Sequence, residues 1–140
     1  MFTDAVLITG SGKSLAAKNT AELYIPFFNA SCSLPELPDN RAWHTLESSR
    51  LVCGGYDYDY NNNYNYKKMD SCLKWSPDNG TWEELLHLET QRFHHVSWTP
   101  DTETGTYLMG GHGSDSKRTT ILLKPDGTQE PGFPLKYDTR

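Results

Sequence analysis

Short apolar runs separated by turn residues recur along the whole chain. A typical run is Leu51-Val52-Cys53, which ends at the doublet Gly54-Gly55. No apolar pattern with a period of 3.6 residues persists for three turns, as a packed helix would require. Asn79-Gly80 and Asp126-Gly127 each stand between two such runs and are strong hairpin signals. The pattern predicts an all-β chain of short antiparallel strands.

The runs belong to a repeat with a period of about 50 residues. In each unit a run ending in glycine is followed by a run ending in proline and then by an Arg-x-x-His segment. The glycines are Gly10, Gly54-Gly55 and Gly110-Gly111, and the Arg-x-x-His segments are 41–44 and 92–95. We expect about three units of four short strands: 1–38, which lacks its leading strand; 39–89, with strands near 43–47, 51–53, 71–75 and 81–85; 90–136; and a fourth beginning at 137–140.

The second unit is longer than the others because residues 56–68 are inserted between two of its predicted strands. This segment alternates tyrosine with aspartate and asparagine, which predicts an extended polar-aromatic loop. Tyrosine-rich loops supply rigid amphipathic contacts at modest entropic cost. The loop is therefore the candidate partner-binding segment, and a solvated loop that binds nothing is the alternative. The candidate contact residues are Tyr56, Tyr58, Tyr60, Tyr64 and Tyr66.

Composition and charge narrow the classes of function. The chain has 140 residues, enough for one domain, and 12% of them are aromatic, which argues against a disordered chain. The net charge is −5, whereas nucleic acid and anionic membranes bind clustered positive charge. No apolar run approaches the roughly 18 residues needed to cross a bilayer, and the first residues do not read as a signal peptide. We therefore expect neither nucleic acid nor membrane as the partner.

Three cysteines and two glycosylation sequons bear on the compartment. Cys53 and Cys72 flank the inserted segment on neighbouring predicted strands, and a bridge between them would contribute about 3 kcal/mol. Free buried thiols are the equal alternative, and Cys32 has no evident partner. Asn29 and Asn79 begin Asn-x-Ser/Thr tripeptides, which also arise by chance. Use of the sequons and the cysteine pair would indicate a secreted protein; otherwise the cytoplasm is expected.

The combination of glycine doublet, tryptophan and Arg-x-x-His resembles the kelch repeat. The residues that carry the resemblance are Arg41, His44, Gly54, Gly55, Trp75, Trp82, Arg92, His95, Gly110 and Gly111. The first unit departs from the pattern with Gly10-Ser11, and the third has no tryptophan in its later half. The resemblance implies an incomplete kelch-like β-propeller of about three four-stranded antiparallel blades, in which glycines make room between blades and tryptophans fill it.

The resemblance also implies a function. We expect a non-catalytic module that binds another protein through loops at the blade rims, because no catalytic, metal or cofactor residues stand out. The five histidines lack the spacing of a metal site. A carbohydrate-binding propeller or a copper enzyme like galactose oxidase is the alternative, and an adaptor of ubiquitin ligases, as some kelch relatives are, is a third. Three blades fit either a fragment of a longer propeller or two chains that close a six-bladed ring.

Overall fold

The protein consists of antiparallel β-sheets joined by short connections. The computed structural model describes residues 5–10, 19–46, 51–58, 66–101, 103–113 and 118–137, and no α-helix occurs among them. The first sheet contains β1 (Val6–Thr9), β2 (Ala21–Ile25) and β3 (Ala30–Leu34), with a short 3-10 helix at Pro26–Phe28. The second contains β4 (Thr45–Leu46), β5 (Leu51–Cys53), β8 (Ser71–Ser76) and β9 (Thr81–His87). The third contains β10 (Val96–Asp101), β11 (Gly105–Met109), β12 (Thr120–Leu123) and β13 (Gln129–Pro131). The predicted all-β architecture is confirmed.

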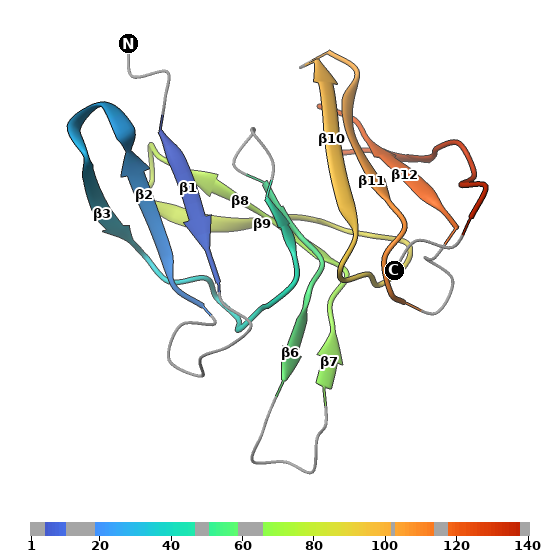
Figure 1. Cartoon of the computed structure of the whole chain (residues 1–140), viewed down its shortest axis with the longest axis horizontal. Helices are drawn as coiled ribbons and strands as arrows, with labels where there is room; N and C mark the ends of the chain where they lie inside the picture. The colour runs from blue at the N-terminus through green and yellow to red at the C-terminus, as the bar shows by residue number, and fades with distance from the viewer. Residues whose placement is uncertain are drawn as a thin grey trace.

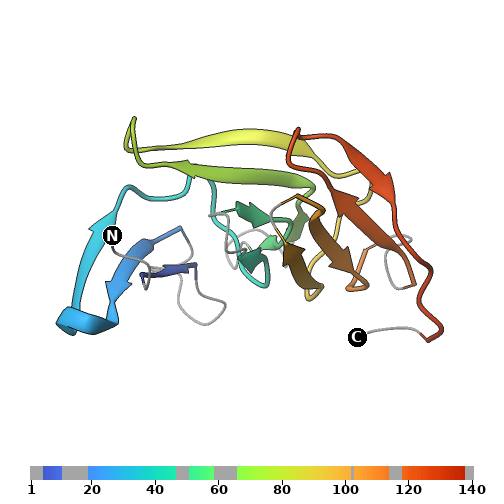
Figure 2. The same cartoon turned by 90° about the horizontal axis from the view of Figure 1, so that it is seen from above.

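The three sheets stand side by side like blades of an incomplete propeller (Figure 1). Viewed from above, β1 and β10 lie toward the middle of the arc, and β3 and β13 lie on its outer side (Figure 2). Within each sheet the strands are neighbours in the order in which the chain makes them, apart from the hairpin β6 (Tyr56–Tyr58) and β7 (Tyr66–Lys68), which projects away from the second sheet. The arrangement is that of a partial propeller and not of a closed barrel.

Two apolar cores lie between neighbouring sheets. One face of the second sheet packs its Val52 and Leu73 against Leu37, which belongs to the connection after the first sheet. The opposite face packs Leu51 and Cys53 against the third sheet. The residues of the third sheet in that core are Leu108, Ile121 and Leu123. The second sheet is thus apolar on both faces, because each of its faces is covered by a neighbour.

The two arginines of the Arg-x-x-His segments are buried and play equivalent structural roles. Arg41 is fully buried and donates hydrogen bonds to the carbonyl of Gly54 at 3.2 Å and to the carbonyl and hydroxyl of Ser71. Arg92 donates in the same way to the carbonyl of Gly110 at 3.2 Å and to Thr119. Each guanidinium therefore ties the start of its unit to the end of the glycine-terminated strand and the beginning of the next strand.

The surroundings of the two arginines differ in one respect. Arg41 also donates to both carboxylate oxygens of Asp39 at 2.9 Å. The chain has Thr90 at the position two residues before Arg92, so that guanidinium lacks the corresponding carboxylate. Burial lowers the pKa of Arg92 to about 10.

The glycine doublets allow histidines to pack between the sheets. Gly54, with φ +63°, lies so close to Arg92 that a Cβ there would meet the Arg92 carbonyl oxygen at 2.3 Å and the His95 ring at 2.9 Å. The Gly55 amide donates to the same carbonyl at 2.9 Å. Gly111, with φ +93°, faces the Cβ of His95 in the same manner. Glycine is required here by both the positive φ and the close approach.

The structure corrects two expectations about the second unit. Residues 56–68 are not a plain loop: their described ends pair as β6 and β7, with Tyr56 opposite Lys68 and Tyr58 opposite Tyr66. Tyrosines favour paired extended strands, and the propensity of these ends prevails over the low complexity of the segment. In addition, the expected strand at 43–47 begins only at Thr45, because Trp43 adopts a left-handed conformation with φ 54°.

Candidate functional site

An aromatic cluster lies at the base of the β6–β7 hairpin, where the second and third sheets meet. We call it the aromatic platform; its members are Trp43, Tyr56, Phe93, His94 and His112. The ring centroids of Trp43 lie 4.4 Å from Tyr56 and 3.9 Å from His94. Phe93 stacks on His112 at 5.4 Å, and His94 meets His112 edge to face at 5.9 Å. The contacts join both histidines and all three larger rings in one surface.

The repeat itself builds the platform. Trp43 and His94 occupy the same position of the two Arg-x-x-His segments, and both adopt left-handed backbone conformations, with φ 54° and 55°. The His94 amide donates to the Trp43 carbonyl at 2.9 Å, which joins the two segments directly. Non-glycine residues rarely adopt such φ values, and those that do cluster at functional sites. Trp43 and His94 are exposed, whereas the arginine two residues before each of them is fully buried.

Two isolated antiparallel β-bridges fix the backbone of Tyr56, Phe93 and His112, the remaining residues of the platform. Ala42 bridges Tyr56, and Phe93 bridges His112; in each pair the second residue follows the glycine doublet directly. The two units therefore present their aromatic residues in register, at the same end of the sheets. This arrangement explains why the platform spans the boundary between units.

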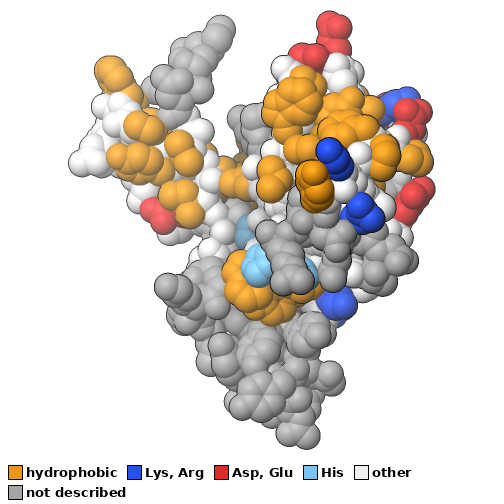
Figure 3. Space-filling view, turned by 45° about the vertical axis from the view of Figure 1, so that its right-hand side comes forward, with side chains coloured by type: hydrophobic (Ala, Val, Ile, Leu, Met, Phe, Trp, Pro, Cys, Tyr) orange, Lys and Arg blue, Asp and Glu red, His pale blue; other side chains and the backbone are white. Residues whose placement is uncertain are grey.

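The platform is open to solvent and carries little fixed charge. Trp43 is 45% exposed and His94 is also exposed, whereas Tyr56, Phe93 and His112 are half-buried. Burial, and next the electrostatic effect of the nearby His112, lower the pKa of His94, so this imidazole is neutral at physiological pH. Figure 3 shows imidazoles and hydrophobic side chains side by side on the surface. Such a surface offers apolar area together with neutral hydrogen-bonding groups.

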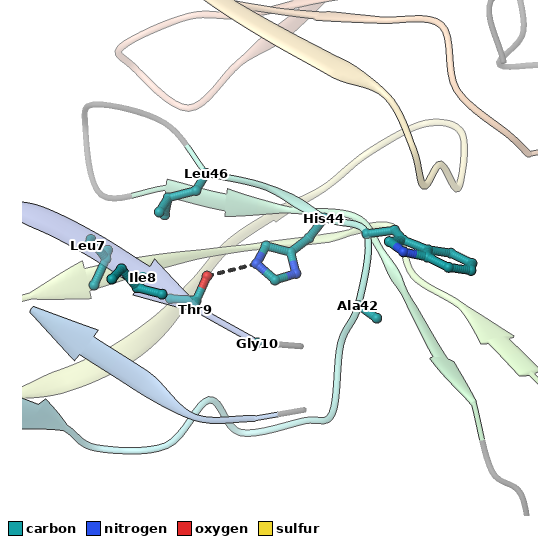
Figure 4. A pocket seen from close by; sticks show the side chains of 8 residues that line it. Leu7, Ile8, Thr9, Gly10, Ala42, His44 and Leu46 are labelled. Carbon is teal, nitrogen blue, oxygen red and sulfur yellow. Dashed lines mark hydrogen bonds between the residues drawn. The ribbon is translucent and has the colours of Figure 1, made fainter. Parts of the chain in front are cut away.

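A cleft of about 360 Å³ adjoins the platform between the first and second sheets. Leu7 of β1 lines one side and Leu46 of β4 another, and a 2.7 Å hydrogen bond joins Thr9 to His44 (Figure 4). Burial, followed by the nearby charge of Arg41, lowers the pKa of His44 to about 4. His44 is therefore a neutral structural group between the sheets, and His95 has the same role through Thr45 at 2.8 Å.

The structure places the sequence-predicted contact residues in different ways. Tyr56 is a member of the platform, Tyr58 and Tyr66 pair in the hairpin, and Tyr60 and Tyr64 lie outside the described residues. Sequence reasoning missed the other four members of the platform. The available signal was the position directly before the histidine of each Arg-x-x-His segment, Trp43 and His94, and the residue after each glycine doublet, Tyr56 and His112, which are aromatic in both units.

The remaining predicted residues occupy defined places. Cys53 and Cys72 form a disulfide between β5 and β8, and Cys32 is a free, exposed thiol. Trp75 and Trp82 face each other across β8 and β9 at 5.3 Å, and the Trp82 indole donates to the Pro35 carbonyl at 2.9 Å. The two sequon asparagines, Asn29 and Asn79, are exposed in turns.

Two negative observations apply to the described part of the chain. It holds no group of three or more histidine, cysteine, aspartate or glutamate residues that could bind a metal ion. Across the same residues, no helix has the length and apolar character needed to span a membrane.

Comparison with known proteins supports the fold alone. No family model and no curated protein matches the chain. Among solved structures, the structure of YjhT superposes with a TM-score of 0.69 over 96% of this chain, at 14% sequence identity. The match covers 50% of the YjhT chain, so this chain spans about half the length of that protein.

Proposed function

We propose that the chain is a kelch-like, non-catalytic binding module, and that it binds another protein through the aromatic platform. The observation that carries the proposal is the pair of left-handed residues, Trp43 and His94, which the repeat holds out at the sheet boundary. Exposed tryptophan and tyrosine are enriched at the energetic centres of protein interfaces, where they bury large area at low entropic cost. The β6–β7 hairpin adjoins this surface and extends it.

The histidines and charged residues around the platform favour binding over catalysis. The buried histidines, His44 and His95, are engaged between sheets, and their lowered pKa values keep them neutral. Lys124 and Glu130 form an exposed ion pair that is far in sequence from the platform. The platform thus presents aromatic faces and the neutral imidazole of His94, which suit recognition.

The test compares how much of a protein partner is captured by three immobilised proteins. These are the natural chain, the double variant Trp43→Asn/His94→Asn, and the control Phe27→Ser. Asparagine tolerates a left-handed conformation, so the double variant removes the two rings and keeps the backbone. Phe27 is 85% exposed on the 3-10 helix between β2 and β3 and does not belong to the platform. We expect loss of at least about 2 kcal/mol of binding, roughly 30-fold in affinity, in the double variant alone.

A carbohydrate ligand is the second candidate, because an exposed indole beside hydrogen-bonding imidazoles also suits the apolar face of a sugar ring. The same three proteins applied to an array of immobilised glycans separate the two candidates. Glycan binding that requires Trp43 would favour the carbohydrate, and protein capture that requires it favours the protein. Undiminished protein capture by the double variant would remove the platform from the proposal.

A further inference from the structure

The third sheet has one apolar face that no part of the described chain covers. Trp98 stacks on Tyr107 at 5.7 Å, and Tyr107 contacts Phe133 at 5.8 Å. Val96 and Met109 are paired one step further along the same two strands, on the same side. Val96 is 61% exposed, Trp98 53% and Phe133 49%. Figure 3 shows hydrophobic side chains gathered over this sheet. We call these five residues the trailing face.

The repeat shows what this kind of face contacts elsewhere in the molecule. Tyr107 and Met109 stand three and one residues before Gly110, as Leu51 and Cys53 stand before Gly54. In the second sheet these positions are buried against the following sheet, with Leu51 6% and Cys53 0% exposed. The trailing face is therefore the surface on which a following blade would pack.

The first sheet is open on its opposite side. Ile8 stands two residues before Gly10, as Val52 stands before Gly54 and Leu108 before Gly110. Val52 and Leu108 are both 0% exposed, and Leu108 packs into the preceding sheet's core. Ile8, in contrast, is 48% exposed, and Val6 on the same side of β1 is 49% exposed. We call Val6 and Ile8 the leading face. By its position in the repeat, this is the surface that would pack on a preceding blade.

The leading and trailing faces of one chain are thus the two halves of the contact that already joins its second and third sheets. We propose that a second copy of the chain covers both, with the first sheet of each copy packed on the third sheet of the other. A two-fold pair satisfies both open faces of both copies at once, whereas a contact that does not close would polymerise.

Sedimentation equilibrium of the 140-residue chain tests this proposal. We expect a mass of about 32 kDa, twice the 15.9 kDa of one chain. Ile8→Lys and Trp98→Lys should each give monomers, because each variant spoils both contacts of the pair. The control Phe27→Lys places the same charge on a residue that is 85% exposed and outside both faces, and it should remain dimeric.

Mixing distinguishes a lost contact from a misfolded variant. A mixed pair of Ile8→Lys and Trp98→Lys chains contains one contact with neither substitution, so native mass spectrometry should detect the mixed dimer where neither variant alone dimerises. A monomeric natural chain at micromolar concentration, or assemblies larger than a dimer, would overturn the proposal. Dissociation by Trp98→Lys but not by Ile8→Lys would also overturn it, since it would mean that third sheets pair with each other.

Discussion

The close contact between Gly54 and the next unit predicts a large difference between two glycine-to-alanine substitutions. Gly54 and Gly80 have the same φ of +63°, but a Cβ at Gly80 would meet nothing within 4 Å. Alanine in a left-handed conformation costs about 1–2 kcal/mol, and loss of chain freedom in the unfolded state offsets about 0.4–1 kcal/mol of this. We therefore expect Gly80→Ala to lower the free energy of unfolding by about 0–1.6 kcal/mol.

Gly54→Ala carries the same conformational cost and a collision. The new Cβ would lie 2.3 Å from the Arg92 carbonyl oxygen, whereas real Cβ contacts are not shorter than 3.0 Å, so the backbone of the third unit must move. That movement breaks the 2.9 Å hydrogen bond from the Gly55 amide to the same carbonyl, and a buried unpaired group costs about 1–3 kcal/mol. The expected total is about 1–5 kcal/mol, which is about 1–3 kcal/mol more than for Gly80→Ala.

Urea unfolding at one protein concentration measures both variants against the natural chain, with the slopes compared so that midpoints can be converted to free energies. A Gly54→Ala variant that falls within about 1 kcal/mol of Gly80→Ala would refute the reasoning. The contact between units would then be adaptable, and the glycine doublet would serve only its local conformation.

Three further predictions concern buried groups. The pKa of His95 is lowered from 6.5 to about 3, first by burial, so its stabilising contribution is complete above pH 6.5 and is lost as the pH falls toward 3. Between pH 6.5 and 4 the lost stabilisation amounts to about 3 kcal/mol. The urea midpoint of His95→Asn should therefore fall less steeply with acid than that of the natural chain. Parallel plots of urea midpoint against pH would contradict the lowered pKa of His95. Thr90→Asp places a carboxylate two residues before Arg92, where the preceding unit has Asp39. The new ion pair should stabilise the protein by about 1 kcal/mol and so raise its melting temperature. An unchanged or lower melting temperature would show that the Arg92 guanidinium already has sufficient hydrogen-bond partners. Replacing Cys53 and Cys72 together by alanine should lower the free energy of unfolding by about 3 kcal/mol or more, which chemical denaturation of the oxidised natural chain and the double variant would show, and equal stabilities would argue against the bridge in solution.

Much of the fold follows from local signals. The all-β architecture was predictable because turn residues bound each apolar run, and the hairpin turns at Gly80 and Gly127 do adopt positive φ values of 63° and 86°. The limits of the inserted segment were also predictable from its composition. Its pairing into β6 and β7 was not, because a tyrosine-rich polar segment is compatible with either an extended loop or a ribbon.

The aromatic platform was the least predictable feature. Tyr56 alone was singled out, as part of a loop, whereas Trp43 and His94 lie 51 positions apart in the printed sequence and meet only because neighbouring units pack in register. Their left-handed conformations were not predictable from the sequence, since a positive φ is uncommon for tryptophan and for most histidines, although histidine adopts it more often than most residues do.

The amino-acid sequence by itself determined which residues recur and therefore where chain direction changes, because glycine's conformational freedom and the short apolar runs act within a few residues of their own positions. Only the tertiary structure decided which recurring residues became interior and which became surface. Leu51 and Tyr107 hold the same place in their units, yet one is buried and the other lies on an open face. The physical reason is that burial belongs to a pair of sheets, and a residue's exposure depends on whether a neighbouring sheet covers it.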